Sequence, residues 1–381
     1  MSTKSRTELV TISMLVVCLT SLGAAQSRTT GGSKPVEQIQ QLTRALSGHW
    51  SLSVNWEPDA TMPRASVNSG VENWRPGPGG YTLIEEEQVQ MHGQQDFLLG
   101  VVWWDSASKS LRGMECQNLL PYTCDIKGAR SDITMGWDGK QFAINEVETS
   151  KSGQKSIWHE TWSDITPTSF IQTGEYGPPG GSRKRVFTIH ATRVANVDSK
   201  ETLETIATEA PSAKGPQPEM QSLVKALAGH WSTTYDFDPS GRSPRGTGSG
   251  EEIWRPSPGG YVLMEEEHFK SLSGEVFLIA LHWWDKSTNS LHGMLCNNAG
   301  PATCDLGSDS NSTVKWDGSR LIIDFNFRRN DKNMLWHEVW SGITATSFTQ
   351  TGDMGEVGGP LKRAVTIHGS KVAGHAQPSA N

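Results

Sequence analysis

The tripeptide Gly48-His49-Trp50 returns later in the chain as Gly229-His230-Trp231. The landmarks that follow recur at nearly the same distance: Trp74-Arg75-Pro76 in the first copy corresponds to Trp254-Arg255-Pro256 in the second. Self-similarity over so long a stretch is the signature of a duplicated unit. The chain of 381 residues is therefore predicted to hold two domains, each near the usual size of a unit with one hydrophobic core.

The composition favours a folded, turn-rich protein. The sequence has 39 Gly, 19 Pro and 15 Trp, and 20% of its residues are charged. The formal net charge is −7, and no polybasic run or basic aromatic patch occurs. Nucleic acid is excluded as a partner, because such proteins carry a basic patch or stripe.

The first 25 residues have the pattern of a secretory signal peptide. Lys4 and Arg6 precede an apolar run over 12–17, and the small residues Gly23-Ala24-Ala25 suit a cleavage site after Ala25. A membrane anchor is disfavoured because polar residues interrupt a run already too short to span a bilayer. We expect a secreted or periplasmic protein with no integral membrane segment after cleavage.

Four cysteines remain after the predicted cleavage, and they repeat with the domains. Cys116 and Cys124 have the same spacing as Cys296 and Cys304. In an exported protein an even count predicts disulfides, here one in each domain. A metal site is disfavoured, because C-x-x-C spacing and a second ligand pair are both missing. No cofactor is predicted.

A short helix runs into a first strand in each copy. Apolar residues at helical spacing precede Gly48 and Gly229, and period-two alternation begins at once with Trp50 and Trp231 facing inward. The remainder shows short strands separated by turn signals, which is typical of antiparallel sandwiches and barrels. Residues 97–104 and 277–284 are apolar on both faces, so the helix or the other domain is expected to cover one face.

These patterns divide the chain into six parts. We predict a signal peptide over 1–25, a spacer over 26–35, a first barrel over 36–196, a linker over 197–216, a second barrel over 217–374 and a flexible tail over 375–381.

A helix that leads into Gly-x-Trp, followed by antiparallel strands with a basic residue on the last one, resembles the lipocalin and calycin barrels. Each copy as a whole resembles a bacterial calycin-like family, the domain-of-unknown-function family 1579. The resemblance implies an all-β protein of two tandem antiparallel lipocalin-like barrels. It also implies that a basic side chain packs on the Trp at the closed end. The matching structural positions are Gly48, Trp50 and Arg193 in the first copy and Gly229, Trp231 and Lys371 in the second.

Repeated carboxylates are the candidate ligand-binding groups. On its strand, Glu86 shares a face with Thr82 and Ile84, and apolar residues on both faces leave open whether a carboxylate of Glu85-Glu86-Glu87 enters the barrel or ends in solvent. A second set places a glutamate between two indoles on one strand face. Such a carboxylate is either a cavity group with a raised pKa or the partner of an arginine such as Arg185. The candidates are Glu86, Trp158, Glu160 and Trp162, with Glu266, Trp336, Glu338 and Trp340.

Three histidines in each copy allow a metal site, but hydrogen-bonded histidines at the rim or surface are the favoured interpretation. They are His49, His159 and His190, with His230, His337 and His368. His190 and His368 lie on a late strand, where the resemblance to nitrobindin-like barrels would place a haem axial ligand.

The favoured function is a binding protein for a small apolar or amphipathic molecule, held in one or both lumens. Ligand-contacting positions are expected where an inward face differs between the copies, as at Ile84 and Met264 or Thr161 and Val339. Motifs for a serine nucleophile, a phosphate loop and a dinucleotide site are missing, so no catalytic residue is predicted.

Three alternatives stay open. They are a haem-binding barrel, a small-molecule isomerase or cyclase that uses a lumen carboxylate such as Glu86 or Glu160, and a structural module whose barrels are filled cores.

Overall fold

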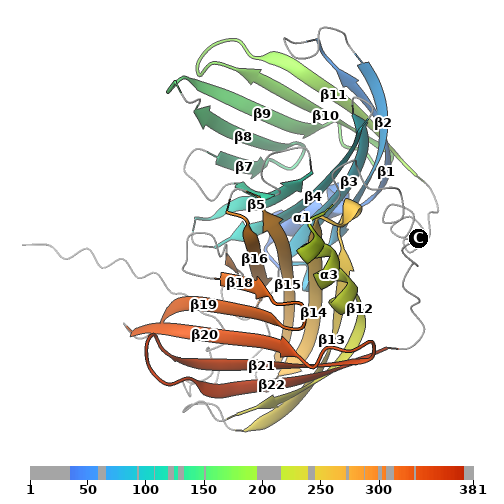
Figure 1. Ribbon diagram of the computed structural model, residues 1–381. Coiled ribbons are helices and arrows are strands. Elements are labelled where there is room, and N and C mark those ends of the chain that lie inside the picture. The colour runs from blue at the N-terminus through green and yellow to red at the C-terminus, as the bar shows by residue number, and fades with distance from the viewer. Residues whose placement is uncertain are drawn as a thin grey trace, which may run out of the picture.

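The computed structural model covers most of both repeats (Figure 1). It describes residues 35–58, 66–91, 94–106, 108–118, 124–127, 133–149, 152–194, 216–238, 245–271, 274–286, 288–298, 303–305, 313–329 and 332–372. The predicted signal peptide and tail, and all but the last residue of the predicted spacer and linker, lie outside these ranges. No helix within them is long and apolar enough to cross a membrane.

Each repeat forms a closed antiparallel barrel of ten strands, which confirms the predicted fold class. The first barrel closes where β4 pairs with β5, and β6 pairs with β5 outside the ring. Its strands are β1 Gly48–Trp56, β2 Ser66–Pro76, β3 Thr82–Met91, β4 Gln94–Asp105, β5 Ser110–Gln117, β6 Cys124–Lys127, β7 Ile133–Trp137, β8 Phe142–Thr149, β9 Lys155–Ser163, β10 Ser169–Gly177 and β11 Lys184–Arg193.

The second barrel repeats this order strand for strand. It closes where β15 pairs with β16, and β17 pairs with β16 outside the ring. Its strands are β12 Gly229–Phe237, β13 Gly246–Pro256, β14 Val262–Ser271, β15 Gly274–Asp285, β16 Ser290–Asn297, β17 Thr303–Asp305, β18 Thr313–Trp316, β19 Leu321–Arg329, β20 Lys332–Ser341, β21 Ser347–Glu356 and β22 Lys362–Lys371.

A helix precedes each barrel and packs at its closed end. Helices α1 (Glu37–Leu46) and α3 (Pro218–Leu227) each bury one apolar face. Trp50 then begins the buried face of β1, and its indole Nε1 donates a hydrogen bond of 2.9 Å to the Leu46 carbonyl. This bond joins the helix to the first strand, and Trp231 makes the equivalent bond of 2.8 Å to Leu227.

A basic side chain covers each of these tryptophans, as the resemblance implied. The Arg193 guanidinium carbon lies 4.2 Å from the centre of the Trp50 ring, and Lys371 Nζ lies 5.0 Å from the Trp231 ring. Such stacked cations are attracted to the ring face. Gly48 leaves the space that this arrangement needs, because a Cβ at its φ of +148° would lie 1.9 Å from Arg193 Nη1.

The structure confirms the two predicted disulfides. Cys116 on β5 is bonded to Cys124 on β6, and Cys296 on β16 is bonded to Cys304 on β17. Each bridge ties the extra strand to the barrel wall at a directly paired position. Disulfides of this kind are typical of proteins in an oxidising compartment.

The two barrels pack against each other through the outer faces of β3–β5 and β14–β16 (Figure 1). These faces form one buried apolar cluster with members from both repeats. The prediction that another element covers the apolar strand 97–104 is therefore confirmed, and the other barrel provides the cover. The larger members are Leu99, Val101, Trp103 and Met114 with Met264, Leu281, Trp283 and Met294.

Four charged residues cross the interface in a reciprocal arrangement. Arg75 donates to Glu266 through Nη1 at 2.8 Å and Nη2 at 2.5 Å. Arg255 donates to Glu86 through Nη1 at 2.6 Å and Nη2 at 3.1 Å. The same residue types on the two repeats contact each other in both directions, as in a two-fold symmetric dimer interface. Bidentate pairs of this kind fix the relative orientation of the barrels.

Candidate functional site

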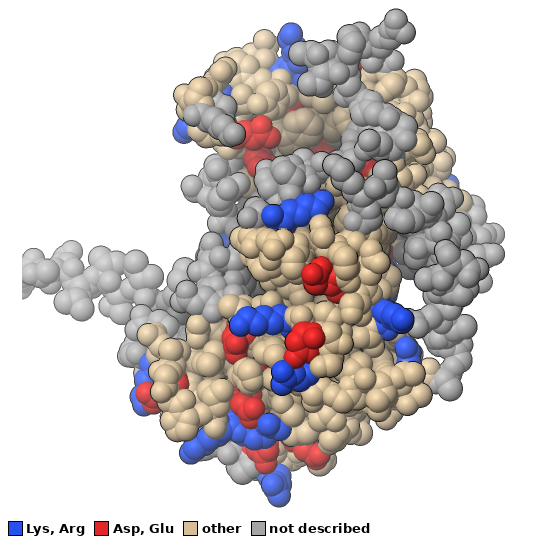
Figure 2. All heavy atoms as spheres, viewed as in Figure 1, with Lys and Arg blue, Asp and Glu red and all other residues tan. Residues whose placement is uncertain are grey.

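The first barrel encloses a cavity of about 310 Å³. Figure 2 shows a hollow in this barrel with acidic side chains at its edge. Among the described residues that line the cavity, none is Lys, Arg or His. Seven acidic residues line it: Glu85, Glu87, Asp96, Glu115, Glu146, Glu148 and Glu160. The lumen is therefore strongly electronegative whenever these groups are ionised.

Three glutamates gather on the wall formed by β2 and β3. Glu72, Glu85 and Glu87 each offer a carboxylate oxygen within 4.8 Å of the others. Glu72 is 1% exposed, and neither of its carboxylate oxygens has a hydrogen-bond partner among the described residues. Burial raises the pKa of Glu72 to about 7, and burial together with the charge of Glu72 raises that of Glu85. We call these three residues the first acidic trio.

Indoles and an amide surround Glu160 on the opposite side of the lumen. Gln172 Nε2 donates a hydrogen bond of 2.8 Å to Glu160 Oε1, and Trp158 Nε1 lies 3.4 Å from Oε2. Trp158 and Trp162, which flank Glu160 on β9, also line the cavity. The structure thus brings the predicted carboxylate and its two indoles together in the lumen.

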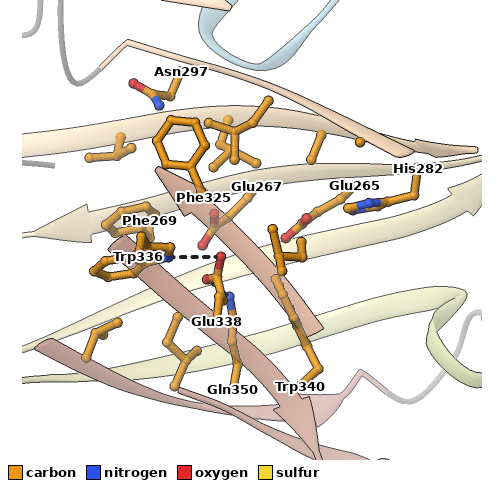
Figure 3. A pocket seen from close by; sticks show the side chains of 18 of the residues that line it. Glu265, Glu267, Phe269, His282, Asn297, Phe325, Trp336, Glu338, Trp340 and Gln350 are labelled. Carbon is orange, nitrogen blue, oxygen red and sulfur yellow. Dashed lines mark hydrogen bonds between the residues drawn. The ribbon is translucent and has the colours of Figure 1, made fainter. Parts of the chain in front are cut away.

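The second barrel encloses a smaller cavity of about 160 Å³ with a different wall. Aromatic and aliphatic residues dominate the lining, among them Phe237, Phe269, Phe325 and Trp336. Figure 3 shows Phe269 and Trp336 on one side of the cavity, with the carboxylates of Glu267 and Glu338 directed toward each other. Three acidic residues line this cavity: Glu265, Glu267 and Glu338.

A tyrosine binds one member of the second acidic trio, which consists of Glu252, Glu265 and Glu267. The Tyr235 hydroxyl donates a hydrogen bond to Glu267 Oε1 and accepts one of 3.2 Å from Thr233 Oγ1. Trp254 Nε1 donates to one oxygen of Glu252 at 3.0 Å. The first barrel has Val54 and Leu52 where the second has Tyr235 and Thr233, so it lacks these hydroxyl donors.

His282 is a buried polar group in the second lumen. It is 2% exposed, its ring stacks on Trp254 at 5.7 Å, and neither ring nitrogen has a hydrogen-bond partner among the described residues. Burial lowers the pKa of His282 to about 4, so the imidazole is neutral near pH 7. It can both donate and accept a hydrogen bond toward a ligand. The first barrel has Val102 at this position.

Six of the eight predicted ligand-binding candidates line a lumen. They are Trp158, Glu160 and Trp162 in the first barrel and Trp336, Glu338 and Trp340 in the second. The expectation that Glu86 and Glu266 face the lumen is wrong, because both point outward and are bound by arginines across the interface. Their neighbours Glu85, Glu87, Glu265 and Glu267 face inward.

The late-strand histidines face outward and cannot serve a ligand in the lumen. His190 and His368 are exposed, whereas their strand neighbours Ile189 and Ile367 line the cavities. A haem axial role for either histidine is therefore wrong. His159 and His337 pair on the outer wall with Asn145 and Asp324, at 2.6 Å each. Neither set forms the three-histidine metal site that the sequence left open.

Sequence reasoning missed several lumen residues. The inward face of their strands was not assigned residue by residue for Glu115, Glu146 and His282, which line a lumen, or for Glu72, which lies within 4.8 Å of Glu85 and Glu87. A signal for them existed, because Glu146 and Phe325, or Val102 and His282, occupy equivalent positions and differ strongly in polarity.

Comparisons with known proteins leave the family open. No protein-family model matches the chain, and no curated protein matches it. A solved structure of a protein with unknown function from the DUF3598 family, from Nostoc punctiforme, is 12% identical with a TM-score of 0.28, covering 88% of this chain and 100% of that one. An acyl-CoA thioesterase II from Mycobacterium marinum is 11% identical with a TM-score of 0.11, covering 64% of this chain and 82% of that one.

A hot dog fold protein of unknown function from Alicyclobacillus acidocaldarius is 9% identical with a TM-score of 0.12, covering 64% of this chain and 97% of that one. At these TM-scores the similarities carry no argument about function, so the site must be interpreted from its own chemistry.

Proposed function

We propose that this chain is an exported binding protein whose second barrel holds a small apolar or amphipathic molecule. The observation that carries this proposal is the cavity of about 160 Å³, which is walled mainly by aromatic and aliphatic side chains. An apolar cavity of about 150 Å³ can admit a molecule of the size of benzene. A single aromatic ring or a short alkyl chain therefore fits this lumen.

The polar groups of the second lumen suit the head of an amphipathic ligand. His282, which has no partner within the described chain, offers both a donor and an acceptor. The Gln350 side chain donates a hydrogen bond of 2.6 Å from Nε2 to Glu338 Oε1, and its own Oε1 has no partner among the described residues. A few polar groups in an otherwise apolar pocket orient a ligand, and the apolar wall supplies affinity.

This proposal is favoured over the alternatives from the sequence. A structural module with filled barrels is disfavoured, because each lumen contains a cavity. The haem-binding hypothesis is disfavoured, because its candidate axial ligands His190 and His368 are exposed on the outer wall. An isomerase that uses Glu86 is disfavoured, since that carboxylate is 0% exposed and bound by Arg255 at the interface. Export is supported by the two disulfides and by the N-terminal sequence pattern.

A matched pair of variants tests the proposal. Leu278 and Leu98 occupy equivalent positions and line the second and first lumen, respectively. We expect indole, toluene or hexanol to bind the wild type, as measured by Trp fluorescence and calorimetry. Leu278→Trp fills the second lumen and should weaken binding at least tenfold, about 1.4 kcal/mol, whereas Leu98→Trp should leave it unchanged. Binding that survives Leu278→Trp, or no binding by any probe at millimolar concentration, contradicts the proposal.

A further inference from the structure

The lumen of the first barrel concentrates acidic side chains on its wall. Its wall carries the acidic residues described above, and no Lys, Arg or His is found among the described lining residues. Clustered carboxylates in a low-dielectric site repel one another unless they take up protons or a cation. We propose that this lumen is a binding site for an organic amine that carries at least one primary ammonium group.

The carboxylate of Glu72 lacks a hydrogen-bond donor among the described residues, which leaves that role to a ligand. It is 1% exposed, belongs to the first acidic trio, and has no hydrogen-bond partner for either oxygen among the described residues. A buried polar group without a partner costs about 1–3 kcal/mol or more. An ammonium group has three donors and a positive charge, so it can satisfy the trio with charge-assisted hydrogen bonds.

Comparison with the second barrel supports this interpretation. There the Tyr235 hydroxyl donates to Glu267 and accepts a hydrogen bond from Thr233, and the Trp254 indole donates to one oxygen of Glu252, whose other oxygen has no partner among the described residues. Val54 and Leu52 take these places in the first barrel and provide no donor. Both copies therefore carry the three glutamates, and of the two only the second carries the hydroxyl donors at these positions.

The size of the lumen and its wall favour an organic cation over a bare metal ion. The cavity of about 310 Å³ lies at the lower end of the usual range of small-molecule pockets, about 300–1,000 Å³. A metal ion held by the trio would leave most of this space unused. Trp56 and Trp158 also line the cavity, and indole rings attract organic cations through their faces.

The carboxylates extend from the trio toward the open end of the barrel. On β3 and β4, Glu85 pairs with Gly100, Glu87 pairs with Leu98, and Val89 pairs with Asp96 near the hairpin. Glu148 is exposed at the far end of β8. An elongated diamine fits this distribution, with one ammonium at the trio and the other near Asp96 or Glu148.

Gly100 provides room for the trio. A Cβ on Gly100 would lie 2.6 Å from Glu85 Oε2, and the second barrel has Ala280 at this position. The amine site does not depend on the proposed apolar site, because the two cavities lie in different barrels and share no lining residue.

Calorimetry on the full chain at pH 8 and physiological salt tests this inference. The probes are 1,5-diaminopentane, butylamine, tetramethylammonium, Ca²⁺ and Mn²⁺. We expect 1,5-diaminopentane to bind one site per chain at least tenfold more tightly than butylamine. Tetramethylammonium, which has no N–H donor, should bind at least tenfold more weakly than butylamine.

Two independent variants locate the site. Glu72→Gln should weaken 1,5-diaminopentane at least tenfold, and so should Leu52→Thr/Val54→Tyr, which supplies the hydroxyl donors of the second barrel. The matched control is Glu175→Gln, which removes a carboxylate bound by Arg185 outside the lumen. It should change affinity less than twofold. Binding of 1,5-diaminopentane to Leu278→Trp, whose second lumen is filled, distinguishes the amine site in the first barrel from the apolar site in the second.

Three results would overturn the inference. The first is Ca²⁺ or Mn²⁺ that binds the trio more tightly than any amine and displaces it. The second is tetramethylammonium that binds as well as the primary amines. The third is the absence of amine binding at millimolar concentration in protein that circular dichroism shows to be folded.

Discussion

The two barrels are most alike at their closed ends and least alike in their lumens. Trp50 and Trp231 are equally buried, and each lies beneath a basic side chain from the last strand. Halfway along the lumen, by contrast, Glu146 faces the first cavity where Phe325 faces the second. The closed end is the part of the unit that folding requires, and the lumen wall is the part that is free to diverge.

This difference implies separate roles for the two cavities. Replacing acidic residues by apolar ones at equivalent positions, as with Asp96 and Val276 or Glu115 and Leu295, changes the class of ligand that a barrel can accept. It leaves the strand order and closure of the barrels the same. The duplication therefore produced two different lumens on one shared frame.

The shared closed end gives the largest predicted effect. Trp50→Ala and Trp231→Ala should each lower the free energy of unfolding by about 3–5 kcal/mol, the usual cost of removing a buried aromatic side chain. Hydrogen exchange should show the loss of protection concentrated in the barrel that carries the substitution. Equal loss in both barrels, or an unchanged melting temperature, contradicts the assignment of these residues to the two closed ends.

The interface gives the next effect. Arg75→Ala removes the bidentate partner of Glu266 and should cost about 3 kcal/mol, because Glu86 and Glu266 are then left between the barrels with Arg255 as their one remaining described cation. Urea denaturation measures this change. The control is Arg185→Ala, which breaks an exposed pair with Glu175 and should cost less than about 1 kcal/mol. If both variants cost the same, the interface pairs do not stabilise the association of the barrels.

A smaller effect sharpens the comparison between the trios. Tyr235→Phe removes the hydroxyl donor of Glu267 and should destabilise the second barrel by about 1–3 kcal/mol. Val54→Tyr in the first barrel should stabilise the protein, because it adds a hydroxyl donor to the first acidic trio at the position equivalent to Tyr235. Thermal unfolding of both variants checks the sign. Destabilisation by Val54→Tyr without any loss of amine binding would show that the trios are not equivalent.

The acidic lumen also predicts a pH dependence. Glu72 offers a carboxylate oxygen within 4.8 Å of Glu85 and Glu87 on β3, and burial raises its pKa to about 7 from the usual value of 4.5. A raised carboxyl pKa means that the folded state holds the proton more tightly, so this stabilisation is complete below about pH 4.5 and is lost as pH rises through about 7. The melting temperature should fall from pH 6 to pH 8, and it should fall less in Glu72→Gln. If the melting temperature falls equally in the wild type and in Glu72→Gln, a group other than Glu72 causes the pH dependence.

The helix, the first strand and the disulfide of each barrel could be predicted from the sequence, because their signals are local and occur in both copies. Helical spacing before Gly48, the inward Trp50 and the paired cysteines depend on neighbours close along the chain. The covered apolar face of residues 97–104 also followed from composition. Each of these features uses a signal that both copies carry independently.

The sequence could not assign the inward face of β3. Glu85, Glu86 and Glu87 are all buried, because the lumen covers one face and the second barrel covers the other. Hydrophobic alternation distinguishes faces only when one of them meets water, and an error of one residue exchanges them. For the same reason the expected ligand positions Ile84 and Met264 lie at the interface instead of in a lumen.

The most direct test of the two-ligand account is native mass spectrometry with 1,5-diaminopentane and indole present together. We expect a ternary complex with one molecule of each ligand per chain. Leu98→Trp should remove only the amine, and Leu278→Trp should remove only indole. Mutual displacement of the two ligands, or loss of both through either single substitution, would contradict the claim that the barrels hold different classes of molecule.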